Sequence, residues 1–212
     1  MIGLDLLTAA WRRLAVGDDR PLDSLVSGGF VAAAVLASGP EPTRDEIVAI
    51  AAAVFLGGSQ GPALVSLVRP VHADLDAVAA AHGLSVGALA EAPRIARVLP
   101  RFDALCARRV VVAYDLAFQA PALARARGPR INMAPRLSLD VRALARAVGV
   151  PTEGLETTAA VLEVAVTGAP GVERDARMAG EIALALLPRL RAHGARTLRD
   201  LLALQRRLAV PA

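Results

Sequence analysis

Three apolar runs follow one another between residues 30 and 70, and they restrict the fold more than any other feature of the sequence. The runs are FVAAAVLAS (Phe30 to Ser38), IVAIAAAVFLGG (Ile47 to Gly58) and PALVSLVRP (Pro62 to Pro70). Continuous apolar runs of this length, rich in Val or Ala and bounded by Gly and Pro, are typical of buried strands. Residues 57–61 join the second run to the third, and a connection this short favours a hairpin. The sequence therefore predicts an antiparallel meander of three strands.

Helical periodicity dominates the rest of the chain and is interrupted by two short apolar runs. The runs at 109–114 and 137–139 indicate further strands, and helices are predicted over residues 73–82, 86–91, 94–108, 116–126, 141–148, 156–166, 173–192 and 197–208. Residues 1–26 form a helical lead segment in this interpretation, with Trp11 as a packing anchor. Strands first, then helices alternating with strands, predict an α/β fold with a mixed sheet, an antiparallel meander followed by parallel strands.

Composition narrows the class of protein. A chain of 212 residues suits one domain with short terminal additions. The stretch Ile47 to Gly57 is about half as long as a membrane helix, and the N-terminus lacks the pattern of a secretory signal. We therefore expect a cytoplasmic protein without a membrane partner. The single Cys106 cannot form an internal disulfide, and it is interpreted as a small apolar core residue.

The basic residues leave two interpretations open. The formal net charge is +4, and all 24 basic residues are Arg. Pairs stand at Arg12-Arg13, Arg108-Arg109 and Arg206-Arg207, with further Arg at 125, 127, 130 and 136 around a connection predicted to be mobile. They are either solvated surface charges, which the sequence favours, or contacts to phosphate. An aromatic content of 3% argues against a platform that stacks single-stranded bases.

Several longer segments resemble one family. They are RDEIVAIAAAVFLGG (44–58), LVRPVHADLDAVAAAHGLSVGALAEAPRIARVLPRF (67–102), RVVVAYDLAFQAPAL (109–123), LSLDVRALARAVGV (137–150) and RDARMAGEIALALLPRL (174–190). In order and spacing they resemble the DnaQ-like 3′–5′ exonucleases, which have an RNase H-like fold. The resemblance implies a lead segment at 1–28, an exonuclease domain at 29–194 and a helix at 195–212 packing on it.

The chemistry of this family requires acids that the sequence lacks. Two divalent metals, about 3.5–4 Å apart, hold the scissile phosphate and activate water, and such hard cations need carboxylate oxygens. The family's first strand ends in Asp-x-Glu, two carboxylates on one face of the strand. The matching positions here are Ala34 and Leu36, and no acid lies between Phe30 and Pro40.

The other catalytic elements are also altered. The family's His-Asn-x-x-Phe-Asp pattern matches residues 114–119, so that Gln119 replaces a metal-binding carboxylate. The general base, five residues before the last Asp, becomes Pro170, which cannot accept a proton. Loss of a general base typically lowers the rate by about 10²–10⁴-fold. Only Asp175 remains of the catalytic set, as a surface or capping acid in the simpler interpretation.

Three functions follow as expectations. The first is a catalytically inactive or strongly impaired exonuclease homologue, a pseudoenzyme without a cofactor that binds a nucleic acid, a nucleotide or a protein partner. The second is a weakly active exonuclease with a relocated Mg²⁺ or Mn²⁺ site, built from Asp115, Glu173 and Asp175 with Asp45 or Glu46. The third is a protein-interaction module or homo-oligomer.

The resemblance also suggests substrate contacts. His82, Tyr114, Asp115 and Phe118 lie at positions beside the family's nucleotide pocket. His82, in the triplet His-Gly-Leu, either contacts a nucleotide or holds a turn through a backbone hydrogen bond, and the second is favoured. Asp140 precedes a predicted helix and is expected to cap it.

Overall fold

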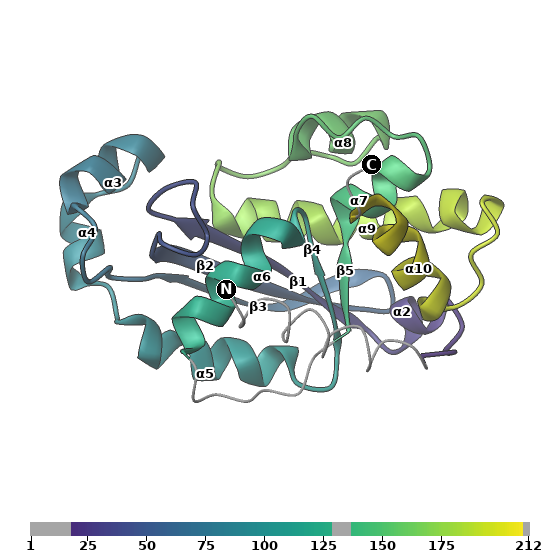
Figure 1. Ribbon diagram of the computed structural model, residues 1–212, viewed down its shortest axis with the longest axis horizontal. Coiled ribbons are helices and arrows are strands. Elements are labelled where there is room, and N and C mark those ends of the chain that lie inside the picture. Colours follow the sequence, from purple (N-terminus) through teal and green to yellow (C-terminus); the bar gives the residue numbers. More distant parts are fainter. Residues whose placement is uncertain (1–17, 129–136, 210–212) are drawn as a thin grey trace.

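The computed structural model describes residues 18–128 and 137–209, and a five-stranded mixed sheet forms its centre (Figure 1). The strands are β1 (Phe30–Ala37), β2 (Ile47–Leu56), β3 (Ser59–Leu67), β4 (Val110–Ala113) and β5 (Ser138–Asp140). Their order is β3-β2-β1-β4-β5. The first three strands are antiparallel, whereas β4 and β5 run parallel to β1. The predicted mixed sheet, with its opening meander, is therefore confirmed.

Helices cover both faces of the sheet. They are α2 (Ser24–Ser27), α3 (Leu75–His82), α4 (Val86–Glu91), α5 (Ile95–Cys106), α6 (Leu116–Arg127), α7 (Val141–Ala147), α8 (Leu155–Val161), α9 (Val172–Ala192) and α10 (Leu198–Ala209). α9 packs along one face together with α7 and α10, and α5 and α6 cover the other face. None of the helices in the described ranges is both long and apolar enough to cross a membrane.

A stacked aromatic pair in the sheet and a glycine of α9 fix the distance between this helix and the sheet. The rings of Phe30 and Phe55 stack with their centroids 4.9 Å apart. Gly180 of α9 lies directly on Phe55, because a Cβ atom at Gly180 would meet the ring at 2.2 Å. The absence of a side chain at Gly180 thus allows the helix to approach the stacked rings.

The C-terminal helix belongs to the same core. Leu198, Leu201 and Leu202 are buried in the cluster that α9 forms with the sheet. Thr197 caps α10: the Asp200 carboxylate accepts from its backbone N–H (2.8 Å), and the Thr197 hydroxyl oxygen accepts from the Asp200 N–H (3.3 Å). This reciprocal pair is a capping box.

Some predicted boundaries were wrong. β3 begins at Ser59 rather than Pro62, because the turn consists of Gly57 and Gly58 alone, both with positive φ, as a two-residue hairpin requires. The helix predicted to end at 166 ends at Val161, and Glu163 beyond it has φ +57°. Helical structure before β1 is limited to α2 in residues 18–28. Trp11 and the connection around Arg130 and Arg136 lie outside the described residues.

Candidate functional site

The candidate site is the carboxyl end of β1, where the resemblance assigns two metal-binding acids. Ala34 and Leu36 project from β1 toward α9 and lie opposite Ala51 and Ala49 of β2. Together they form a β1–α9 apolar cluster whose members are Ala34, Leu36, Ala49, Ala51, Leu67, Val172 and Ala176. Only 6% of the surface of Ala34 is exposed to solvent. Hydrocarbon side chains therefore fill the end of β1 that faces the start of α9.

This cluster does not fit a pair of divalent metals. Mg²⁺ and Mn²⁺ prefer oxygen ligands, and none of the seven side chains in the cluster carries one. Among residues 18–128 and 137–209, no group of three or more His, Cys, Asp or Glu side chains is placed to hold a metal ion. The side chains present thus cannot supply the ligand set that the two-metal reaction needs.

Asp175 lies in the first turn of α9, beside the apolar cluster. Gly171 is the N-cap residue of this helix, so the Asp175 side chain does not cap it. Burial raises the pKa of the Asp175 carboxyl, although the Arg174 guanidinium, 3.6 Å away, acts in the opposite direction. Pro170 is exposed in the segment before the helix. Asp175 is the one acid that remains of the family's catalytic set, and its carboxylate is partly buried.

Gln119 is buried on α6, with 7% of its surface exposed. Its Nε2 donates to the backbone carbonyl of Tyr114 at 2.6 Å. Its Oε1 is buried and accepts no hydrogen bond from any described residue. An amide oxygen can coordinate a cation, but it brings no charge to the site.

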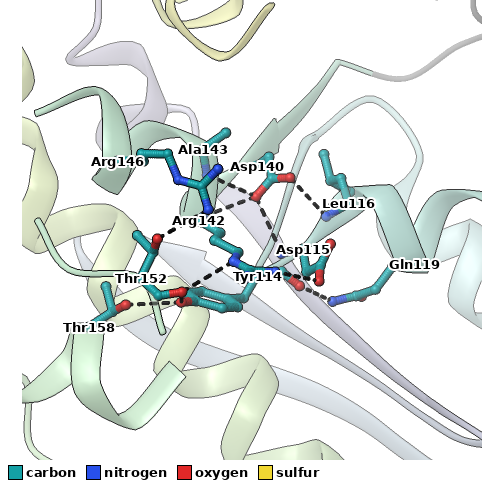
Figure 2. Close-up of polar contacts among 10 residues, drawn as sticks. All are labelled: Tyr114, Asp115, Leu116, Gln119, Asp140, Arg142, Ala143, Arg146, Thr152 and Thr158. Atoms are coloured by element: carbon teal, nitrogen blue, oxygen red, sulfur yellow. Dashed lines mark hydrogen bonds and ion pairs between the residues drawn. The ribbon is translucent and has the colours of Figure 1, made fainter. Parts of the chain in front are cut away.

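A polar network occupies the ends of β4 and β5 (Figure 2). At its centre, the Asp140 carboxylate accepts from four backbone N–H groups: Arg142 (3.0 Å), Ala143 (3.3 Å), Leu116 (3.0 Å) and Asp115 (3.3 Å). Asp140 thus caps α7, as expected, and also binds the first turn of α6. Burial raises its pKa, although the backbone donors act in the opposite direction.

The same network engages two of the predicted substrate contacts. Asp115, with φ +64°, forms an ion pair with Arg142 at 3.0 Å. The Tyr114 hydroxyl lies 3.0 Å from Thr158 Oγ1 and donates to the Thr152 carbonyl at 3.3 Å. Burial raises the pKa of Tyr114. Both side chains therefore hold α7 and α8 against the strand ends.

The remaining predicted contacts lie apart from this network. His82 Nε2 donates to the Ala37 carbonyl at the end of β1 at 3.0 Å. His82 thus makes the expected hydrogen bond to the backbone, but this bond joins α3 to the sheet and does not close the turn at His82. That turn ends at Gly83, which has φ +63°. Phe118 is half-buried on α6.

Of the acids considered for a relocated site, Glu46, Asp45 and Asp115 have other partners, whereas Glu173 is exposed in the first turn of α9. Glu46 accepts from the N–H groups of Val71 (2.8 Å), His72 (2.7 Å) and Ala73 (2.9 Å). Burial raises the pKa of Glu46, but these bonds outweigh it and the net pKa is lowered. Asp45 accepts from the Glu41 N–H at 2.7 Å. These contacts and the ion pair of Asp115 hold the backbone and helices of this chain.

Two of these roles were missed by the sequence reasoning, namely the second cap made by Asp140 and the anchoring of residues 71–73 by Glu46. The partners are separated by 24 to 27 residues along the chain. No local pattern reports such contacts, and only the paired strand ends bring them together.

The chain is similar in fold to solved structures of exonucleases. Exonuclease X in complex with 5′ overhanging duplex DNA superposes with a TM-score of 0.60 at 18% identity, over 83% of this chain and 99% of that chain. Exonuclease I from E. coli in complex with a dT13 oligonucleotide superposes with a TM-score of 0.62 at 16% identity, over 78% of this chain and 43% of that chain. Exonuclease I from Methylocaldum szegediense superposes with a TM-score of 0.61 at 16% identity, over 77% of this chain and 41% of that chain. This chain therefore spans less than half of the exonuclease I chains.

These likenesses establish the fold. The chain has the RNase H-like fold of the DnaQ-type exonucleases, as its segment order predicted. No protein-family model matches the sequence, and no curated protein matches it.

Proposed function

We propose that this protein is a catalytically inactive or strongly impaired homologue of the DnaQ-like exonucleases that binds nucleic acid without cutting it. The β1–α9 apolar cluster is the observation that carries the proposal. A side chain of Ala or Leu at residues 34 and 36 offers no lone pair to a cation, and a metal-dependent reaction at phosphate loses its main source of charge stabilisation without bound metals.

The residues left around the cluster do not replace that chemistry. Asp175 supplies one carboxylate, and Gln119 supplies at most one neutral oxygen. Pro170, at the position of the family's general base, cannot take a proton from water. A single carboxylate without a general base supports positioning or repulsion of a phosphate, not its hydrolysis.

Nucleic-acid binding is supported at the level of the fold. Exonuclease X and exonuclease I have been solved with DNA bound, and the present chain shares their architecture. Binding needs only donors and positive charge toward phosphate, and Arg supplies both. Removal of metal ligands therefore leaves a route to binding that is independent of catalysis.

The test measures retention and cleavage on the same substrate. The full chain is titrated with Mg²⁺ and Mn²⁺ in the presence of 3′-labelled DNA of about 20 nucleotides, single-stranded and duplex, longer than the usual site size. We expect a retained complex at low salt and no release of the 3′ label, for both the wild type and Asp175→Ala.

Two results would contradict the proposal. Metal-dependent cleavage that Asp175→Ala abolishes would establish a working relocated site. DNA that is neither retained nor cut at low salt would remove nucleic acid as the ligand and favour a protein partner.

A further inference from the structure

The helices on the face of the sheet opposite α9 carry a net positive charge. α5 and α6 lie side by side on this face (Figure 1) and share one buried cluster with the sheet. Residues 92–128, which include both helices, contain seven Arg and two Asp, a net charge of +5 that exceeds the +4 of the whole chain. The rest of the molecule is thus slightly acidic.

The two acids in this region do not neutralise the exposed arginines. Asp103 pairs with Arg127 at 2.7 Å, and these side chains are largely buried between α5 and α6. Asp115 pairs with Arg142 at 3.0 Å, at the far end of α6. The outer surface of α5 therefore retains its charge.

Three arginines form a line along that surface. Arg97 and Arg101 are four residues apart and lie on one side of α5, and Arg94, the N-cap residue of this helix, stands three residues before Arg97. All three are exposed. Arg97 and Arg101 form no ion pair with any described residue, and Arg94 donates from Nη1 to the Pro70 carbonyl at 3.4 Å. We refer to these three side chains as the α5 arginine stripe.

One segment on the opposite face, beside the β1–α9 apolar cluster, has the reverse polarity. Residues 151–187, which include α8 and most of α9, contain six acids and two Arg, a net charge of −4. This segment borders the β1–α9 apolar cluster, where no described group of ligands holds a cation. A polyanion is therefore attracted to the α5 side of the molecule and repelled by the acidic segment that borders the cluster.

We propose that the α5 arginine stripe binds the phosphate backbone of nucleic acid, so that the binding surface of this protein lies apart from the degenerate site. The inference rests on the nucleic-acid binding proposed above and assigns a surface to it. Guanidinium groups suit the task because each offers a fork of N–H donors to phosphate oxygens. Seven residues of helix span roughly 10 Å, which is about three phosphates along one strand.

The surroundings favour nucleic acid over a lipid surface. Peripheral helices bind membranes by inserting apolar side chains, but Val98, Leu99 and Phe102 of α5 are buried against the sheet. The aromatic side chains of the described residues are all buried or half-buried, so stacking on bases is not offered. Contacts to phosphate alone carry no sequence information, and we therefore expect binding without sequence preference.

Charge-neutralising pairs of substitutions test the assignment. Arg97→Gln with Arg101→Gln removes two charges from the stripe. Arg189→Gln with Arg207→Gln removes two charges from α9 and α10, and serves as a control because both side chains are exposed and in no ion pair with a described residue. Binding to a labelled DNA duplex of about 20 base pairs is followed by fluorescence anisotropy between about 50 and 200 mM salt. Circular dichroism verifies that each variant is folded.

The expected result is a loss of affinity in the stripe variant alone. On duplex DNA, each phosphate contact adds about 0.9 to the magnitude of the negative slope of log affinity against log salt. Two lost contacts therefore reduce this magnitude by about 1.8 and weaken binding roughly tenfold or more. Equal losses in both double variants would overturn the assignment of the surface while leaving nucleic-acid binding intact. A wild type that does not bind DNA at low salt would overturn both proposals, and binding to anionic vesicles instead would identify a membrane surface.

Discussion

A carboxylate placed at residue 34 distinguishes a filled apolar cluster from an open metal cleft. Ala34 is 6% exposed and packs in the β1–α9 apolar cluster. Burial of a carboxyl in such surroundings raises its pKa by up to about 3–5 units, and each unit corresponds to about 1.4 kcal/mol. With a shift of about three units, Ala34→Asp lowers the free energy of unfolding by about 4 kcal/mol at a pH well above the raised value.

The pH dependence identifies the cause. When the pKa of an acid is raised in the folded state, its contribution to the free energy of unfolding is fully present below the unfolded-state pKa. This contribution is lost as the pH rises through the folded-state pKa. Urea unfolding followed by circular dichroism should therefore give a larger penalty near pH 8 than near pH 5. The matched control is Ala63→Asp, at an exposed position of the edge strand β3, which should cost less than about 1 kcal/mol at either pH. If Ala34→Asp is no more destabilising than Ala63→Asp near pH 8, residue 34 faces solvent and the reasoning fails.

Three further substitutions test the structure around the site. Asp140→Ala removes the acceptor of two helix starts and should cost about 2–4 kcal/mol in chemical unfolding, against about 1 kcal/mol for Asp74→Ala, which caps α3 alone; equal costs would exclude the second cap. Gly180→Ala should destabilise by about 1–3 kcal/mol, because its Cβ would strike Phe55, whereas an unhindered helix would gain about 1 kcal/mol; a raised melting temperature would contradict this contact. Asp175→Asn should stabilise the fold by less than about 1 kcal/mol at neutral pH, since burial raises the pKa of Asp175, and this gain should vanish below the ordinary pKa of an aspartate; a gain that persists in acid would show a different origin.

Local patterns predicted the elements well where burial and turn chemistry agree. The run at Ile47 was expected as a buried strand, and β2 is buried along almost its whole length. Asp140 was expected to cap a helix, and it does. The end of the helix after Val161 could not be read, because the apolar residues continue past it while Glu163 adopts a left-handed conformation. Periodicity reports which side chains are apolar, not where the backbone turns.

The site was less accessible to sequence reasoning because its contacts are distant along the chain. Matching to a family placed Ala34 and Asp175 near one another, and both lie at the β1–α9 junction, on elements that pack together. The resemblance also offered Tyr114 and Asp115 as substrate contacts, yet their partners in the structure are side chains of this chain, with Arg142 among them. A substrate role for these positions stays a prediction. Residue type alone does not reveal whether a polar side chain already has a partner.

The substitutions at the site have consequences for stability as well as for chemistry. Two carboxylates on one strand face repel each other unless a cation lies between them, so a metal site at residues 34 and 36 would depend on metal to be stable. The alanine and leucine found there pack with Val172 and Ala176 and need no ion. Other acids near the strand ends, Glu46 among them, accept hydrogen bonds within the chain and could not turn toward a metal without releasing those donors. We therefore expect the stability of this fold to be independent of divalent metal, so that chelation leaves its unfolding midpoint unchanged.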